Sequence, residues 1–267
     1  MALFCDVEPF RFKYFSLQHH RSAMRLTTDS VLLGAWVRTG ATAQAVVHIT
    51  TPQTVLDVGT GCGILALMMA QRFQQARIYA IDIDELSVRE ARENVSLSPW
   101  PERICIFEGD FRSFVLPHTY DLIITNPPYF RGALLSSYAR RTRARHSDDS
   151  SITHEELLKG AVHKLTEDGV FALILPADRE VGFLSMALKG SVPLYPSRIT
   201  RVTAGSALSC NNSTLWSTTG EEPTRVLLEL TKKQTTPRIE TLPMYDKGRG
   251  KYSPQYMALI KDFYLWA

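Results

Sequence analysis

The sequence predicts an α/β fold with a mostly parallel, seven-stranded sheet and helices on both of its faces. Short apolar runs typical of buried strands alternate with segments that have helical periodicity. The first apolar run passes directly into a glycine-rich turn and a helix, over residues 55–70, as nucleotide-binding α/β units begin. The seven predicted strands cover residues 55–58, 77–84, 103–107, 120–125, 170–175, 198–202 and 225–230.

The composition is that of a protein outside the membrane and outside secretory compartments. Hydrophobic residues make up 45% of the 267 residues, but no apolar run approaches the roughly 20 residues of a membrane span. The first residues do not have the pattern of a signal peptide, so we expect a cytoplasmic protein. The cysteines are scattered without metal-ligand spacing, and we expect reduced thiols and no metal: Cys5, Cys62, Cys105 and Cys210.

The glycine-rich turn contains the first chemical signal. Its glycines, Gly59, Gly61 and Gly63, are spaced Gly-x-Gly-x-Gly, and Asp57 precedes them. Glycines allow a tight turn and a close approach of the backbone to a ligand. A carboxylate at this strand end would repel a pyrophosphate and attract a cationic amino group. S-adenosylmethionine carries an ammonium and a sulfonium but no phosphate, so it fits this turn better than NAD; a turn without a ligand is the alternative.

Acidic residues also follow the second and third predicted strands. Asp82 lies 19 residues beyond Gly63, near the offset at which an acid meets ribose hydroxyls in doubly wound folds. Asp84 is expected to cap the helix over residues 85–97. After the third strand, Asp110 could accept a hydrogen bond from an adenine amino group, and Phe111 could lie against the ring. A plain turn role for Asp110 is the alternative.

Two further segments have the pattern of helix starts. Thr27, Thr28 and Asp29 stand just before the apolar run 31–37, and they are residue types that cap helices. Thr28 is therefore either a contact of the S-adenosylmethionine carboxylate or part of a simple cap. The pattern of residues 153–156 predicts a capping box at the start of a helix over 154–165.

The fourth predicted strand ends in the second chemical signal, Asn126-Pro127-Pro128-Tyr129. Prolines have no backbone N–H, so this segment can present carbonyl groups to a cleft. The Asn126 side-chain oxygen and the Pro127 carbonyl can each accept one hydrogen of an amino group, and Tyr129 offers a flat ring. The segment therefore predicts a planar substrate that carries an NH₂ group, although a Pro-Pro strand stop is the simpler alternative.

An arginine-rich run follows this motif. Residues 131–146 contain five arginines and no acidic residue. Guanidinium groups match phosphates in shape and charge, so the run favours contact with a nucleic acid, although such runs are also found on solvated surfaces. The candidate phosphate-binding residues are Arg140, Arg141, Arg143 and Arg145.

The glycine loop together with the motif at Asn126 resembles Rossmann-like class I S-adenosylmethionine-dependent methyltransferases that act on exocyclic or amide nitrogens. The flanking segments 10–13, 24–36, 144–146 and 261–265 are similar to those of bacterial valine-tRNA (adenine-N6)-methyltransferases. This resemblance covers nearly the whole chain. It implies methyl transfer from S-adenosylmethionine to N6 of the adenosine 3′ of the anticodon of valine tRNA. We expect residues 1–45 to be an extension that contacts substrate and cofactor, and residues 46–267 to be the methyltransferase domain.

Three other functions are compatible with parts of this pattern. Methylation of guanine N2 in rRNA and of a glutamine in a protein use related motifs, and the arginine run argues against the protein substrate. A binding module for S-adenosylmethionine or a nucleotide, without catalysis, is the third. The presence of both Asp82 and the complete motif at residues 126–129 argues against such a module.

Overall fold

The structure is a computed structural model that describes residues 8–37, 51–115, 117–127, 152–204, 222–246 and 251–267. Its main sheet has eight strands in the order β10-β8-β9-β7-β6-β3-β4-β5. The strands are β3 (Thr54–Val58), β4 (Arg77–Asp82), β5 (Ile104–Glu108), β6 (Tyr120–Thr125), β7 (Leu165–Pro176), β8 (Tyr195–Thr203), β9 (Pro223–Thr231) and β10 (Arg238–Pro243). All seven predicted strands are therefore confirmed.

The prediction of seven strands was nevertheless one short. The additional strand, β10, pairs in parallel with β8 at the edge of the sheet. Only Leu242 of its six residues is buried, and Ile239 is exposed. An edge strand with one buried side chain has too little apolar alternation to be recognised from sequence.

The strand directions place the ends of β3 and β6 side by side. β5, β4, β3, β6 and β7 are mutually parallel, and β9 runs antiparallel to both β7 and β8. The chain proceeds from β3 outward to β5 and then returns to β6 on the other side of β3. In parallel α/β sheets, ligands bind at the carboxyl ends of the strands where the order reverses in this way. The glycine loop follows β3, and Asn126 follows β6.

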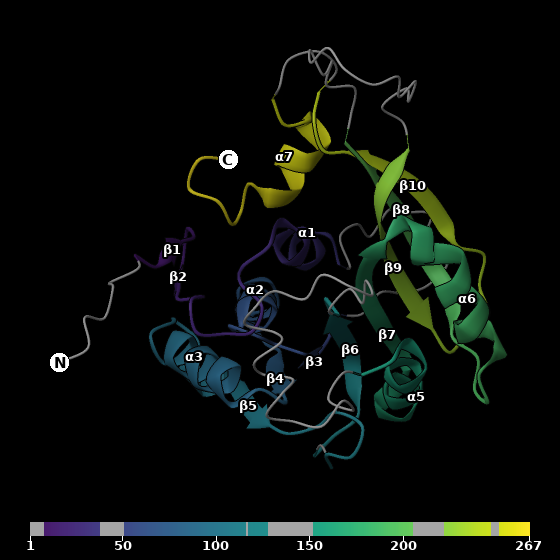
Figure 1. The fold of residues 1–267 in the computed structure, drawn as a ribbon, viewed down its shortest axis with the longest axis horizontal. Coiled ribbons are helices and arrows are strands. Elements are labelled where there is room, and N and C mark those ends of the chain that lie inside the picture. Colours follow the sequence, from purple (N-terminus) through teal and green to yellow (C-terminus); the bar gives the residue numbers. More distant parts are fainter. Residues whose placement is uncertain (1–7, 38–50, 116, 128–151, 205–221, 247–250) are drawn as a thin grey trace.

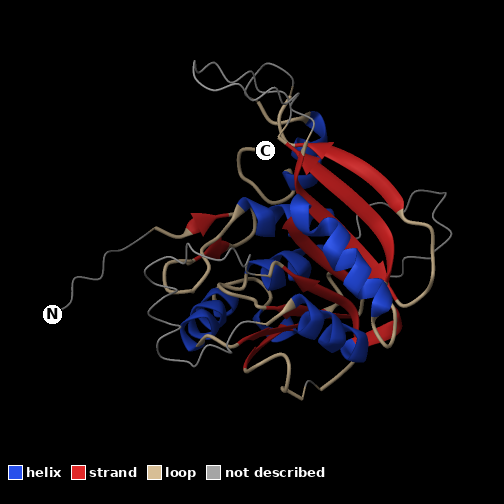
Figure 2. Ribbon diagram, turned by 45° about the vertical axis from the view of Figure 1, so that its right-hand side comes forward, coloured by secondary structure: helices blue, strands red, loops and turns tan. Residues whose placement is uncertain are grey.

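Both faces of the sheet are buried, which explains why the strands read as continuous apolar runs. Along β3, Val55 belongs to one hydrophobic cluster and Leu56 to the other, as expected for alternating side chains. Helices α1 (Thr28–Trp36), α2 (Ile64–Arg72) and α7 (Pro254–Ile260) pack in the first cluster. Helices α5 (His154–Lys164) and α6 (Glu180–Lys189) pack in the second. Figure 2 shows the helices on both sides of the strands.

The helix starts follow the predicted caps. Asp84 caps α3 (Glu85–Ser96) by accepting a hydrogen bond from the Ser87 backbone amide at 2.8 Å. Thr153 and Glu156 form the predicted capping box of α5. Thr27 caps α1 through the Ser30 amide. Of the apolar residues of α3, Val88, Ala91 and Val95 are buried, whereas Leu86 is 41% exposed.

The N-terminal segment is packed against the rest of the fold. Strands β1 (Phe10–Arg11) and β2 (Ser16–Leu17) form a hairpin beside the C-terminal tail (Figure 1), where Phe12 bridges Tyr264. Helix α1 lies in the hydrophobic core, and its Trp36 donates from Nε1 to Thr200 Oγ1 at 2.9 Å. The expected boundary at residue 45 falls outside the described residues. Within the described part of the chain, no helix has the length and apolar character to cross a membrane.

Candidate active site

The glycine loop crosses the carboxyl end of β4 and presents an open backbone surface. Gly59, Gly61 and Gly63 have φ angles of 70°, 54° and 86°, in the region that favours glycine. The amides of Gly59 and Thr60 donate to the Ile81 carbonyl at 2.9 and 3.1 Å. Gly59 is exposed, and no heavy atom of the described residues lies within 4 Å of where its Cβ would stand. A ligand can therefore approach the backbone closely at Gly59.

Asp57 lies beneath this loop. It is fully buried, and its Oδ2 accepts from Thr60 Oγ1 at 2.6 Å and from the Ala66 amide at 3.1 Å. Burial raises the pKa of its carboxyl from 3.8 to about 7. Its Oδ1 has no hydrogen-bond partner among the described residues, although it is buried. Asp57 thus ties the loop to the start of α2 and brings a buried acid under the ligand-facing glycines.

Asp82 stands beside the same loop, at the end of β4. Its Oδ2 accepts from the Gly61 amide at 2.8 Å, and its Oδ1 accepts from the Asp84 amide at 3.0 Å. The residue is partly exposed, and burial raises the pKa of its carboxyl. The structure therefore places this carboxylate against the glycine loop while leaving part of it accessible.

Asp110, the first of the two predicted adenine contacts after β5, is held by an arginine. Asp110 forms an ion pair with Arg112, whose Nη2 lies 2.6 Å from Asp110 Oδ2, and this hydrogen bonding lowers the pKa of the Asp110 carboxyl. Arg112 also lies 3.4 Å from Glu156 in the first turn of α5. Asp110 remains partly exposed and accessible.

Phe111, in contrast, is buried in the core. It is 5% exposed and belongs to the cluster beneath α5. Its Cε1 lies 2.4 Å from where a Cβ on Gly160 would stand, and Lys164 Nζ lies 4.9 Å from its ring centroid. The ring of Phe111 fills the space that Gly160 leaves open, so little of it is exposed on the side where an adenine ring was expected.

Asn126 and Pro127 lie next to the glycine loop, at the end of β6. The preceding Thr125 donates from Oγ1 to the Val58 carbonyl at 2.8 Å, which links the ends of β6 and β3. Asn126 is 5% exposed, and its Nδ2 donates to Ser30 Oγ at 2.8 Å. Pro127 is buried. The two sequence motifs are thus brought together at the carboxyl ends of two neighbouring strands, β3 and β6.

The start of α1 completes this region, and sequence reasoning found only part of it. Thr27, the cap of the helix, also lies 3.4 Å from Asn126 Nδ2. Thr28 is exposed at the first helical position, and Asp29 pairs with Arg225 of β9 at 2.8 Å. The contact between Ser30 and Asn126 was missed, because nothing local in the sequence signals a partner 96 residues away.

Several predicted site residues lie outside the described residues. These are Tyr129 and the arginines Arg140, Arg141, Arg143 and Arg145. Among the residues that are described, no group of three or more His, Cys, Asp or Glu side chains could hold a metal ion.

Comparisons with known proteins agree with this arrangement. The family model of the methyltransferase small domain matches residues 40–186. The chain is 37% identical over 257 residues to the tRNA1(Val) (adenine(37)-N6)-methyltransferase of Tolumonas auensis, covering 96% of each chain. It is 36% identical over 259 residues to the protein of that name from Bacteroides fragilis, covering 96% of this chain and 97% of the relative.

Solved structures share the fold at low sequence identity. A predicted O-methyltransferase of Agrobacterium tumefaciens superimposes with a TM-score of 0.62 and 18% identity, covering 88% of this chain and 96% of the other. A Listeria monocytogenes structure described as a class I S-adenosylmethionine-dependent methyltransferase superimposes with a TM-score of 0.54 and 13% identity. The match covers 90% of this chain and 70% of the other.

The sheet order, the glycine loop and the matched domain together define a class I methyltransferase. Within this class, the chain belongs to the tRNA1(Val) (adenine(37)-N6)-methyltransferase family, because its curated relatives match it along almost their whole length. The family resemblance found in the sequence is thereby confirmed.

Proposed function

We propose that this protein transfers a methyl group from S-adenosylmethionine to N6 of the adenosine 3′ of the anticodon in valine tRNA. The observation that carries the proposal is the position of Asn126 and Pro127 beside the glycine loop, at the ends of neighbouring strands β6 and β3. The names of the relatives specify adenine 37 of tRNA1(Val) as their target. Guanine and glutamine are disfavoured as targets, because these relatives are adenine methyltransferases.

The glycine loop and its two carboxylates fit S-adenosylmethionine. The open backbone at Gly59 allows close approach, and Asp82 would accept hydrogen bonds from the ribose hydroxyls. Asp57, whose carboxyl pKa is raised by burial to about 7, would add negative charge beneath the loop above that pH, toward the cationic amino group. Asp110 would accept from the adenine amino group, and Thr28 would bind the carboxylate. Gly61 and Gly63 supply the backbone conformation that the turn requires.

Asn126 and Pro127 would orient the substrate nitrogen. The Asn126 side-chain oxygen and the Pro127 carbonyl would each accept one hydrogen of the amino group, which withdraws the nitrogen lone pair from conjugation with the ring and directs it toward the methyl group. S-adenosylmethionine supplies an electrophilic methyl group on its sulfonium, so alignment of the nitrogen provides most of the acceleration. Asn126 donates from Nδ2 to Ser30 Oγ in α1 and to Thr27 Oγ1 at its cap, and these hydrogen bonds hold the amide in one orientation and support this role.

The tRNA would be bound by residues that follow Pro127 in the chain. An adenosine must be unstacked before its amino group can reach such a site, as in other enzymes that modify bases. Tyr129 would then stack on the exposed base. Arg140, Arg141, Arg143 and Arg145 would contact the phosphate backbone, so tRNA affinity should fall steeply as salt concentration rises.

The decisive experiment is incubation of the protein with labelled S-adenosylmethionine and unmodified valine tRNA, followed by digestion to nucleosides. We expect label in N6-methyladenosine, and no label in a tRNA whose adenosine 37 is replaced by guanosine. Label in N2-methylguanosine, or in a protein glutamine, would overturn the proposal.

The variant Asn126→Ala tests the role of the site in the same assay. We expect kcat to fall by at least about 100-fold while S-adenosylmethionine affinity changes little, because a transition-state contact is lost. Ser30→Ala is the matched control: it keeps Asn126 and removes one of its hydrogen bonds, so kcat should fall by only about tenfold. Unchanged turnover in Asn126→Ala would exclude a catalytic role for this residue.

A further inference from the structure

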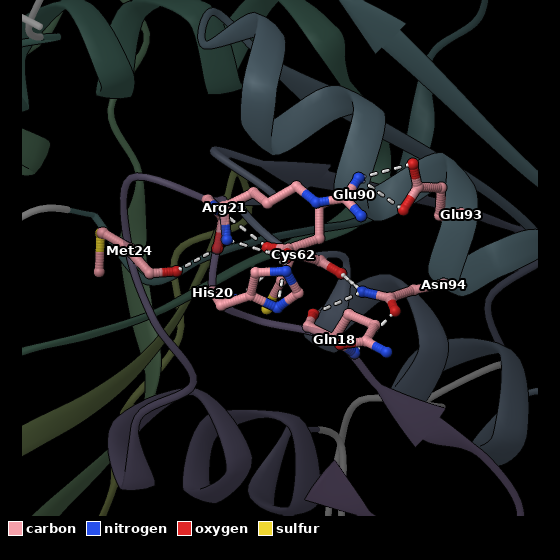
Figure 3. A network of polar contacts seen from close by, with 9 residues as sticks. Gln18, His20, Arg21, Met24, Cys62, Glu90, Glu93 and Asn94 are labelled. Carbon is pink, nitrogen blue, oxygen red and sulfur yellow. Dashed lines mark hydrogen bonds and ion pairs between the residues drawn. The ribbon is translucent and has the colours of Figure 1, made fainter. Parts of the chain in front are cut away.

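Residues 18–24 form a strap that crosses one face of α3 and lies against the glycine loop (Figure 3). The strap is attached mainly through its backbone. Its amide and carbonyl groups bond to three side chains of α3, namely Ser87, Glu90 and Asn94. These residues are spaced so that they share one helix face. The attachment therefore holds the backbone of the strap in place and depends little on which side chains the strap carries.

Glu90 is the centre of this attachment. Its side chain is fully buried, and its two oxygens accept from three consecutive amides. Oε1 lies 3.0 Å from His20 N and 2.9 Å from Arg21 N, and Oε2 lies 2.9 Å from Ser22 N. A buried carboxylate is costly unless it is fully hydrogen-bonded, and hydrogen bonds to a charged acceptor are strong. Glu90 thus holds the strap more firmly than an uncharged acceptor would.

Asn94 connects the strap to the glycine loop. Its Nδ2 donates to the carbonyls of both Gln18 and Cys62 at 2.8 Å, and its Oδ1 accepts from the Gln18 amide. On the same helix, Ala91 Cβ lies 3.3 Å from where a Cβ on Gly63 would stand. One helix face therefore supports the strap and the loop together.

The strap then reaches both halves of the active site. The Met24 carbonyl accepts from Ser22 Oγ at 2.8 Å and lies 3.7 Å from where a Cβ on Gly61 would stand. Three residues later, Thr27 caps α1 and contacts Asn126. The path of the strap consequently determines what lies beside Gly61 and where α1 begins.

We infer that Glu90 is a positioning residue that holds the strap as one wall of the S-adenosylmethionine site. This inference rests on the proposed function, because it assigns that cofactor to the glycine loop. Glu90 does not touch the reacting groups; it acts through the strap. Its loss should weaken cofactor binding much more than tRNA binding, whereas a merely structural role would reduce the amount of folded protein and leave both affinities equal to wild type.

The test compares Glu90→Gln with Glu93→Gln, one turn along α3. Glutamine at position 90 keeps the shape but turns an NH₂ group toward an amide that needs an acceptor. We expect S-adenosylmethionine affinity, measured by calorimetry, to fall about tenfold, with tRNA affinity within about twofold of wild type. Glu93 is exposed and bonds to the Arg21 side chain at 2.7 Å, so its variant should match wild type in both affinities.

Limited digestion with trypsin gives an independent readout of the strap. Arg21 and Arg25 lie in and just after it, and Glu90→Gln should be cut there faster than Glu93→Gln or wild type. If Glu90→Gln does not fold, Ser87→Ala replaces it. This variant removes the acceptor for the Ala23 amide of the strap, which lies at 3.1 Å, and outside the strap one hydrogen bond to Asp84 at 2.8 Å. That variant should bind S-adenosylmethionine about threefold more weakly.

The outcomes separate this inference from the proposed function. If wild type binds no S-adenosylmethionine or methylates no tRNA, the proposed function fails. If wild type does both but Glu90→Gln, or Ser87→Ala in its place, binds the cofactor as wild type does, the inference about the strap is overturned. Equal weakening in Glu93→Gln would also overturn it, because the effect would then come from the surface of α3.

Discussion

The two sides of the glycine loop are built differently. Underneath, Asp57 is fully buried and bonds to Thr60 and Ala66 within the loop and α2. On the outer side, Gly59 is exposed and Asp82 remains partly accessible while it holds Gly61. Two aspartates in contact with the same loop therefore have separate tasks. The buried one maintains the turn, and the accessible one is available to a ligand.

The largest expected effect comes from the outer side. Asp82→Ala removes the carboxylate proposed to bind both ribose hydroxyls, and each lost charge-assisted hydrogen bond costs about 1.5–3 kcal/mol. We expect S-adenosylmethionine affinity to fall by at least about 100-fold, with a much smaller change in thermal stability. Calorimetric titration and thermal unfolding measure the two quantities. A loss of stability without a loss of cofactor affinity would mean that Asp82 supports the turn and does not contact the ligand.

The matching change underneath should have the opposite profile. Asp57→Ala leaves the Thr60 hydroxyl and the Ala66 amide without their buried acceptor. We expect the free energy of unfolding to fall by about 2 kcal/mol, measured by denaturant titration. Because the turn loosens, cofactor affinity should also fall, but by less than in Asp82→Ala. Wild-type stability in Asp57→Ala would contradict the structural role.

Two glycine substitutions sharpen the same contrast. Both Gly59 and Gly63 have positive φ angles, so alanine at either costs about 1–2 kcal/mol in backbone strain. A Cβ at Gly63 would also meet Ala91 Cβ at 3.3 Å, whereas one at Gly59 would point into open space. Gly63→Ala should therefore be the less stable variant in thermal unfolding. For each variant, the loss of cofactor affinity is divided by the loss of stability, and this ratio should be larger for Gly59→Ala than for Gly63→Ala. Equal ratios would contradict the idea that Gly59 faces the ligand and Gly63 faces the protein interior.

The last contrast concerns pH. Burial raises the pKa of the Asp57 carboxyl from 3.8 to about 7, so the folded state keeps a proton that the unfolded state releases between these values. The unfolded state then binds fewer protons, and stability falls as pH rises from about 4 to about 7, by at most about 1.4 kcal/mol per pH unit.

Asp57→Asn tests this pH dependence. Asparagine keeps one oxygen to accept from both Thr60 and Ala66, and its NH₂ replaces the oxygen that lacks a partner among the described residues. Stability measured from pH 4 to pH 8 should depend less on pH than in wild type. Some dependence should remain, because burial also raises the pKa of Asp82. An unchanged slope would mean that Asp57 does not titrate in this range.

Local patterns in the sequence predicted much of this fold. The apolar runs located seven strands because both faces of the sheet are buried, and the caps at Asp84 and Thr153 located two helix starts. The glycine spacing and the motif after β6 were each visible locally. That they meet depends on the order of the strands in the folded sheet, since parallel strands with a reversal place these ends together.

What the sequence did not predict depends on contacts between distant segments. Strand β10 is stabilised by pairing with β8 rather than by its own pattern. Phe111 is a core residue because Gly160 leaves room for its ring. Glu90 is covered by the strap, and nothing near it in the sequence indicates this burial. These roles follow from tertiary packing, which overrides local propensity.

The pairing of the first hairpin with the last residues has a consequence for biosynthesis. Phe12 bridges Tyr264, and the Lys13 amide donates to the Phe263 carbonyl at 2.8 Å. During translation the hairpin is synthesised before the strap, but it cannot form these contacts until Phe263 and Tyr264 have also been synthesised. Contacts between such distant segments form late, because closing a long loop costs entropy before any contact compensates it. A nascent chain therefore cannot complete the packing of this hairpin until the segment around Tyr264 has been synthesised.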